Sequence, residues 1–292
     1  MIPLEIVFLV IFWAWAATAV LFLRNTILPR IPLWRTPETV GLPSETVRFQ
    51  ATDGYHLEGW KIPVDHSRPW ILLCHGAGSN RADLLEIAAG LHAAGFNLLL
   101  FDFRGHGGSR GWTTSFGWQE RHDLKGALAW LGRQPEIPSN PYGVYGISMG
   151  ASVALMVAAQ DERLGAVAAD GPYTTLDASL GQHLALLYPV LPHLPFLWLL
   201  LATYRMRFGV SPRRVSPQAA VAAVSPRSLL LIQGGQDRRT PLEGARTLYA
   251  AAGDPKDLMV VEEAGHLEAY AVNPEVYLKR LVQFFEASLL TN

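Results

Sequence analysis

The chain has 292 residues, of which 50% are hydrophobic and 17% charged, with a formal net charge of −1 at pH 7. This length and apolar content suit one sizeable domain with appendages, and the balanced charge argues against a nucleic-acid partner, which requires a basic surface. The single cysteine, Cys74, excludes an intramolecular disulfide and a cysteine-based zinc site. Because it ends the apolar run Trp70–Cys74, we expect a buried thiol rather than a nucleophile.

The first predicted element is an apolar run without charge at residues 6–23. As a helix it would measure about 27 Å, close to the thickness of the hydrocarbon core of a bilayer. Residues 1–23 are therefore predicted to form a transmembrane anchor. The alternative is a cleaved signal peptide with a small-residue site at Ala17–Ala19, but no basic residue precedes the run, as a signal peptide requires.

The residues on either side of this run predict its orientation. Glu5 precedes it, whereas Arg24, Arg30 and Arg35 follow it. Positive residues favour the cytoplasmic side, so we expect a single-pass membrane protein with a cytoplasmic catalytic domain. Residues 24–43 contain several prolines and are expected to be an extended linker.

From residue 44 onward, short apolar runs alternate with helical stretches, which predicts one catalytic domain over residues 44–292. The first two strands are joined around Asp53-Gly54, a hairpin signal. Continuous apolar strands separated by helices predict an α/β fold with a mostly parallel sheet and helices on both faces. The predicted strands are residues 46–51, 56–62, 70–74, 96–101, 142–145, 166–169, 228–232 and 258–261, and the predicted helices are residues 81–94, 118–132, 149–160, 242–252 and 274–288.

A serine flanked by glycines marks the turn between a predicted strand and the following helix, in Gly146-Ile147-Ser148-Met149-Gly150. A tight turn of this kind presents the serine hydroxyl and places it at a helix N-terminus, whose N–H groups stabilise a developing oxyanion. We expect Ser148 to be a nucleophile. The alternative is a serine that only caps the helix.

The base and the acid are sought after later strands, because ligands bind at the carboxyl ends of the strands in such sheets. His266 follows the last predicted strand and is the predicted base. His106 is a rival, but it precedes Ser148 and is interpreted as loop structure. Asp237 follows the strand at 228–232 and is the predicted acid, with Asp170 as the alternative.

The oxyanion hole requires two N–H donors. One is expected from Met149, the residue after the nucleophile, and the other from Ala77 in the loop after the strand at 70–74. Gly76 and Gly78 flank Ala77 and leave the backbone open to a substrate oxygen, so Gly76 is also a predicted substrate-binding residue.

Five ordered motifs together resemble the α/β-hydrolase superfamily, over roughly residues 45–289. The nearest resemblance is to its membrane-tethered esterase, monoacylglycerol-lipase-like and serine-aminopeptidase-like branch. The resemblance implies an eight-stranded sheet and maps the family's nucleophile, acid and base onto Ser148, Asp237 and His266, and its oxyanion donors onto Ala77 and Met149. The motifs are HGAGSN (75–80), DFRGHGGSRG (102–111), GISMG (146–150), GGQDRRTP (234–241) and EAGH (263–266).

The long segment between the sixth and seventh predicted strands resembles the family's helical cap, expected at about residues 176–224. Its prolines argue against a second transmembrane helix. One interpretation is a set of packed cap helices. The other is an apolar cap that contacts the bilayer and lines a groove for an acyl chain, with Leu187, Leu191 and Phe196 as substrate-binding residues.

Together these features predict a serine hydrolase that cleaves carboxylic esters, with apolar acyl esters or lipids favoured, through an acyl-enzyme intermediate. No metal and no cofactor is implied. The expected partners are a small-molecule or lipid ester and a membrane, contacted through the N-terminal helix and the cap. The alternatives are a serine aminopeptidase, an acyl-thioesterase, and a non-catalytic ligand-binding protein of the same fold.

Overall fold

The apolar runs of the sequence form one sheet in the computed structural model, which describes residues 3–26, 30–65, 67–137, 141–187, 189 and 193–290. The strand order is β1-β2-β4-β3-β5-β6-β7-β8. Strand β2 is antiparallel to both of its neighbours and every other neighbouring pair is parallel, which confirms the predicted mostly parallel, eight-stranded sheet. The strands are β1 (Glu45–Gln50), β2 (His56–Ile62), β3 (Trp70–Cys74), β4 (Asn97–Phe101), β5 (Tyr142–Ile147), β6 (Leu164–Asp170), β7 (Ser228–Gly234) and β8 (Lys256–Val261).

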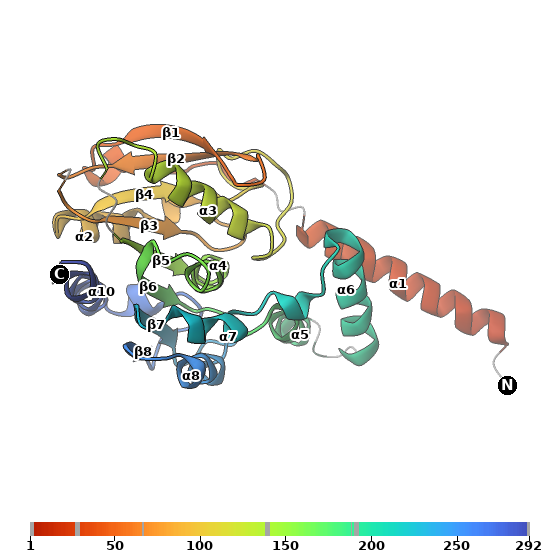
Figure 1. Cartoon of the computed structure of the whole chain (residues 1–292). Coiled ribbons are helices and arrows are strands. Elements are labelled where there is room, and N and C mark those ends of the chain that lie inside the picture. The colour runs from red at the N-terminus through yellow and green to blue at the C-terminus, as the bar shows by residue number, and fades with distance from the viewer. Residues whose placement is uncertain are drawn as a thin grey trace.

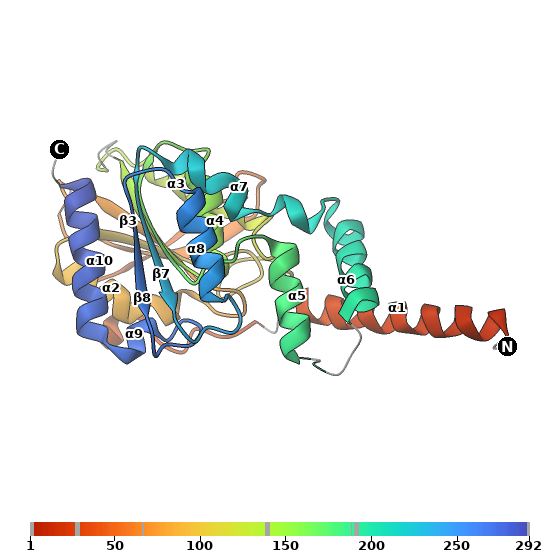
Figure 2. The ribbon, with the colours of Figure 1, turned by 90° about the horizontal axis from the view of Figure 1, so that it is seen from below.

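Helices cover both faces of this sheet (Figure 2). Helices α2, α9 and α10 pack on one face, and α3, α4 and α8 pack on the other. The sheet therefore lies between two apolar layers, as expected for parallel strands that are buried on both sides. These helices are α2 (Leu85–Ala93), α3 (Glu120–Leu131), α4 (Met149–Ala158), α8 (Leu242–Ala251), α9 (Ala269–Val272) and α10 (Pro274–Leu289).

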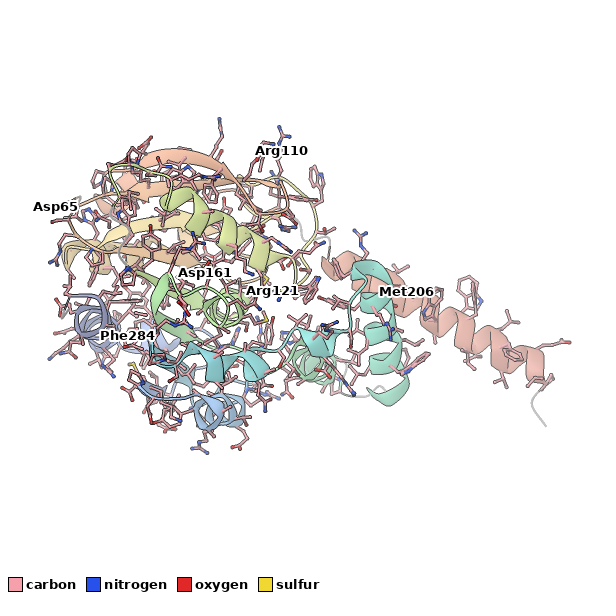
Figure 3. All side chains as sticks on the ribbon, viewed as in Figure 1. Asp65, Arg110, Arg121, Asp161, Met206 and Phe284 are labelled. Carbon is pink, nitrogen blue, oxygen red and sulfur yellow. The ribbon has the colours of Figure 1, made fainter. Side chains whose placement is uncertain are left out.

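Strand β3 shows how alternate side chains build the two layers. Ile71 and Leu73 belong to the core on the α10 side, whereas Leu72 and Cys74 belong to the core on the α4 side. On the α10 side, Phe284 points from the helix toward the sheet (Figure 3) and is also buried. Burial raises the pKa of the Cys74 thiol, which makes it a packing residue and a poor nucleophile.

Between β6 and β7 the chain leaves the sheet and forms a separate group of helices. Helix α5 (Leu176–Leu187) lies near the loop after β7, to which Gln182 binds by donating a hydrogen bond from Nε2 to the carbonyl of Arg238, at 2.9 Å. Helix α6 (His193–Phe208) lies beyond it, beside α1 (Leu4–Thr26), which projects away from the sheet (Figure 1). The chain returns to β7 through η3 (Pro212–Arg214), α7 (Pro217–Ala220) and η4 (Val221–Val224).

The predicted transmembrane anchor at residues 1–23 is wrong. A helix that crosses a bilayer needs about 20 consecutive apolar residues. Within the described ranges, no helix combines the length and the apolar character that a crossing requires. The single-pass localisation, with its cytoplasmic catalytic domain, was derived from this anchor and is wrong with it.

The segment that follows α1 and was predicted to be an extended linker is bonded to the loops around β3 and β4. The Arg30 guanidinium donates to the carbonyl oxygens of Ser109 and Gly111, at 2.6 and 2.9 Å. Trp34 donates its indole N–H to the carboxylate of Asp83 at 2.9 Å. These bonds attach the segment, which includes η1 (Pro37–Val40), to the loops that surround the candidate site.

A buried arginine holds the loop after β4 in place. The Arg104 side chain is 2% exposed and donates to Asp123 on α3 and to Asp53 in the β1–β2 turn, with bonds of 2.6 and 2.8 Å. Burial acts to lower the pKa of Arg104, but its bonds to the two carboxylates outweigh burial and raise it. The guanidinium therefore stays charged and ties three parts of the chain together.

We expect Arg104→Met to lower the free energy of unfolding by about 3 kcal/mol, because it leaves the carboxylate of Asp123 buried without its cation. Urea unfolding followed by circular dichroism measures the change. Arg48→Ala is the matched control, since the Arg48 side chain is 81% exposed in its ion pair with Glu58 and surface pairs contribute little. Equal losses in the two variants would contradict the prediction.

Candidate active site

The predicted nucleophile lies at a strained turn between β5 and α4. Ser148 has φ 51° and ψ −114°, a backbone conformation that side-chain-bearing residues rarely adopt. A Cβ on Gly146 would lie 2.5 Å from the backbone of Gly150, and a Cβ on Gly150 would collide with the carbonyl of Cys74. Only glycines fit on either side of the serine, which explains the Gly-Ile-Ser-Met-Gly spacing in physical terms.

The structure brings the predicted nucleophile, base and acid into one chain of hydrogen bonds. His266, in the loop after β8, has its Nε2 at 3.1 Å from Oγ of Ser148. Its Nδ1 lies 2.7 Å from Oδ2 of Asp237, in the loop after β7. A carboxylate only accepts hydrogen bonds, so Nδ1 carries the proton and Nε2 is left to accept from the serine hydroxyl. The three roles stay predictions, and the geometry is what they require.

The carboxylate of Asp237 accepts hydrogen bonds from other groups besides His266. Oδ1 of Asp237 accepts from the N–H groups of Arg239 and Thr240, at 2.8 and 2.9 Å. Oδ2 accepts from Oγ1 of Thr240 at 2.7 Å and from Nε2 of Gln233 at 3.0 Å. Burial would raise the pKa of Asp237, but the bond and charge of His266 and the bonds from Thr240 outweigh it, so the pKa falls. The carboxylate is ionised at neutral pH, as an orienting acid should be.

The two predicted oxyanion donors lie beside the nucleophile. Met149 begins α4, and within the described chain no hydrogen-bond acceptor is recorded for its N–H or for that of Ala77. Gly76, between β3 and Ala77, approaches the serine so closely that a Cβ there would lie 3.5 Å from Cβ of Ser148. Two unused donors next to a nucleophile can hold an oxyanion. Their assignment, and that of Gly76 to substrate binding, stay predictions.

Comparison with known proteins agrees with this geometry. The family model described as alpha/beta hydrolase fold matches residues 69–189. The uncharacterized protein YqkD of Bacillus subtilis is 30% identical over 235 residues, which cover 80% of this chain and 76% of YqkD. The uncharacterized protein Rv2307c of Mycobacterium tuberculosis is 32% identical over 240 residues, which cover 82% of this chain and 78% of that protein.

Among solved structures, the Pyrococcus furiosus esterase Pf2001 aligns with a TM-score of 0.76 and 26% identity, over 90% of this chain and 98% of the esterase. The chain belongs to the α/β-hydrolase superfamily. The predicted resemblance to the superfamily and the predicted fold class are therefore confirmed, and family membership together with the likeness to an esterase supports a hydrolase activity.

In this α/β-hydrolase, two buried histidines hold the loop that carries Ala77. His106 donates from Nδ1 to the carbonyl of Arg104 at 2.8 Å and accepts at Nε2 from the N–H of Gly78 at 3.2 Å. His75 accepts at Nε2 from the N–H of Phe103 at 3.0 Å. Burial lowers the pKa of both imidazoles, so they stay neutral and keep these acceptor nitrogens. His106, the rival histidine, therefore makes hydrogen bonds within these loops and supports the loop that carries the predicted oxyanion donor Ala77.

We expect His106→Ala to lower kcat about tenfold with little change in KM. The substitution removes the acceptor of the Gly78 N–H and lets the neighbouring oxyanion donor move, a smaller effect than losing the donor outright. Steady-state hydrolysis of a p-nitrophenyl ester measures it.

The control for this experiment is His92→Ala, which removes an imidazole from α2 on the side of the molecule away from the site. Melting curves show whether each variant is folded. A folded His106→Ala enzyme with unchanged kcat, or with a change in KM alone, would contradict the assigned role.

The alternative acid, Asp170, does not contact the base through a hydrogen bond. It ends β6, and its Oδ2 accepts from the hydroxyl of Tyr277 at 2.8 Å. Its backbone carbonyl accepts from the N–H of Ser148 at 2.8 Å. The geometry therefore favours Asp237 as the orienting acid and leaves Asp170 as a buried neighbour.

Cap helix α5 contributes a histidine that the sequence did not single out. His183 donates from Nδ1 to the carbonyl of Ser179 at 2.9 Å, which leaves Nε2 as an acceptor. Burial lowers the pKa of His183, and the nearby charges of Arg239, His266 and Asp237 also act on it. The imidazole of His183 therefore lies close to His266 and Asp237. Its position in an apolar helix pattern gave no signal, because only the packing of α5 decides which face meets the site.

Thr240 is a second residue that the sequence did not assign. Its Oγ1 donates to Asp237 and lies 3.2 Å from Nδ1 of His266. It belongs to the GGQDRRTP motif, so its spacing from the acid was the available signal. Thr240 also lines a cavity of about 230 Å³ between α5 and the loop after β7, with Ser179, Gln182 and Glu243 among its polar lining residues.

A second cavity, of about 330 Å³, lies within the cap, between α5, α6 and η3. Trp198, Leu201 and Ala202 are its apolar lining residues, and Asp177, Arg205 and Arg213 line it as well. Of the predicted substrate-binding residues, Leu187 is 64% exposed at the end of α5, Phe196 is half-buried on α6, and Leu191 lies outside the described residues. None of the three lines either cavity, so their roles stay predictions.

Proposed function

We propose that this α/β-hydrolase is a serine hydrolase that cleaves carboxylic esters through an acyl-enzyme intermediate. One observation carries the proposal. The hydroxyl of Ser148, the imidazole of His266 and the carboxylate of Asp237 are joined by hydrogen bonds of 3.1 and 2.7 Å. This connection activates a serine hydroxyl that is otherwise a weak nucleophile.

In the proposed mechanism, Oγ of Ser148 attacks the ester carbonyl carbon while Nε2 of His266 takes the hydroxyl proton. The N–H groups of Ala77 and Met149 stabilise the tetrahedral oxyanion. When the oxyanion collapses, the bond to the alcohol breaks and His266 gives its proton to the leaving oxygen. Water then attacks the acyl-enzyme with His266 as base, which releases the carboxylic acid and restores the serine.

For the substrate we propose an ester with an apolar acyl group. The solvent-open pocket of the cap, which Trp198, Leu201 and Ala202 line, supports this choice. We further propose that residues 44–292 form the catalytic domain, with the cap at about residues 176–224.

An aminopeptidase would need a carboxylate for the substrate amine. Glu243 lines the same cavity as Thr240, but the cation of Arg239 lines it too, which does not favour an amine there.

We expect the wild-type protein to react with a fluorophosphonate probe and Ser148→Ala to remain unlabelled, because only an activated serine attacks the phosphorus centre. In-gel fluorescence and intact mass measure the adduct. Ser67→Ala, which removes an exposed serine of the β2–β3 connection, is the matched control and should label normally. A wild-type protein without an adduct would favour the non-catalytic alternative.

We expect kcat/KM to rise with acyl-chain length in a series of p-nitrophenyl esters, and Trp198→Ala to reduce the gain for the longer chains, since each buried methylene contributes about 0.8 kcal/mol. Met206→Ala, on the same helix and 64% exposed, is the control. A flat series would argue against the apolar acyl pocket. Faster cleavage of aminoacyl amides or of acyl thioesters would instead favour those alternatives.

A further inference from the structure

A second buried carboxylate lies at the centre of the catalytic arrangement without belonging to it. Asp170 ends β6, between the strands that precede the nucleophile and the acid. Its carbonyl accepts from the N–H of Ser148 at 2.8 Å, and the next residue, Gly171, donates its N–H to the carbonyl of Ile232 on β7 at 3.0 Å. The backbone of Asp170 therefore connects the two halves of the site.

The imidazole of His266 packs against the backbone at Gly171. A Cβ on Gly171 would lie 3.4 Å from Cε1 and 3.6 Å from Nδ1 of His266. The charges of His266 and Asp237 both act on the carboxyl of Asp170. The aspartate is thus close enough to interact with the imidazole electrostatically, although it makes no hydrogen bond to it.

The carboxyl of Asp170 is satisfied by hydroxyl groups rather than by a cation. The residue is 3% exposed, and its Oδ2 accepts from the hydroxyl of Tyr277, on α10. The hydroxyl of Tyr145, on β5, lies 2.8 Å from that of Tyr277. Since Tyr277 gives its proton to the carboxylate, its oxygen is the acceptor for Tyr145. Within the described residues, no lysine or arginine forms an ion pair with this carboxylate.

Four titratable groups therefore face Asp170, from four elements: Tyr145, Tyr277, His266 and Asp237. Burial raises its pKa to about 6, the bond from Tyr277 and the charge of His266 oppose this, and the charge of Asp237 adds to it. At neutral pH the carboxylate is ionised, and it takes up a proton as the pH falls through about 6. When His266 is protonated, it becomes the cation near this buried carboxylate. The two opposite charges then attract each other.

We propose that Asp170 is a positioning residue whose carboxylate favours the imidazolium form of His266 in the transition state, and that the Tyr145–Tyr277 pair keeps this carboxylate ionised. The inference rests on the proposed serine-hydrolase function. Asp237 orients the ring through a hydrogen bond, whereas Asp170 adds negative charge near it without a hydrogen bond. The contribution is largest when Ser148 has given its proton to the ring, because only then is the ring positively charged.

The test is the pH profile of kcat/KM for p-nitrophenyl acetate in Asp170→Asn and Tyr277→Phe. Asn keeps the shape and accepts from Tyr277, but it carries no charge. We expect kcat about tenfold lower at neutral pH with KM unchanged, and loss of the fall in kcat/KM that protonation of Asp170 near pH 6 causes in the wild type. Tyr277→Phe removes the donor that keeps Asp170 ionised, so its acid limb should move to higher pH.

Tyr145→Phe is the matched control, since it deletes the same kind of buried hydroxyl but leaves the bond from Tyr277 to the carboxylate intact. Its shift should have the direction of Tyr277→Phe and be smaller. Loss of the fall near pH 6 in Asp170→Asn, together with its move to higher pH in Tyr277→Phe, is the signature of electrostatic action, because loss of packing would lower kcat without changing the shape of the pH profile. If Asp170→Asn does not fold, Tyr277→Phe decides, with an unmoved limb overturning the inference.

Failure of the inference and failure of the proposed function give different results. If wild type hydrolyses the ester and labels with fluorophosphonate, Ser148→Ala does neither, and both Asp170→Asn and Tyr277→Phe keep the wild-type pH profile, Asp170 is only structural. If wild type neither hydrolyses nor labels, the serine-hydrolase proposal fails, and the role of Asp170 fails with it. Asp237→Asn should lower kcat by far more than Asp170→Asn, and the reverse order would make Asp170 the orienting acid.

Discussion

The backbone strain at Ser148 is the constraint on which the rest of the site depends. For a residue other than glycine, a backbone conformation with φ 51° is unfavourable by roughly 1–3 kcal/mol. It persists only where the surrounding structure enforces it. Here the enforcement comes from the close packing of Gly146 on Gly150 and from the bond between the serine N–H and the end of β6. The same turn directs Oγ toward His266, and among the described residues none accepts a hydrogen bond from the N–H of Met149.

Around this turn, the loops that carry function are held by buried polar networks rather than by apolar packing. Asp102 accepts from the backbone N–H and the guanidinium of Arg81 and from the N–H of Gly108, at 2.7 to 2.8 Å, which joins the loops after β3 and β4. His106, in the loop after β4, accepts from the N–H of Gly78 and so connects this loop to the one that carries Ala77. Loops are usually the mobile part of a domain, and buried charge-assisted hydrogen bonds give these loops defined positions.

Much of the fold and the candidate triad could be predicted because both leave local signals. Apolar runs such as Trp70–Cys74 are buried on both faces, and Ser148, Asp237 and His266 each follow a strand. Other features depend on packing between distant segments. Hydropathy describes the composition of the first helix, α1, but not that it lies along α6. Likewise, the approach of His183 to the acid depends on which face of α5 meets the loop after β7.

Strand β6 carries none of the three triad residues, yet it is the mechanical bridge between them. One side of its carboxyl end bonds the nucleophile and the other bonds β7, the strand that leads to the acid. Fraying of this single strand end would separate serine from imidazole while both apolar layers stayed intact. Inactivation by heat or mild denaturant should therefore precede the global loss of structure, as it does when a locally weak unit opens first. For this hydrolase, the amide protection of Ser148 and Gly171 would report the working lifetime of the site.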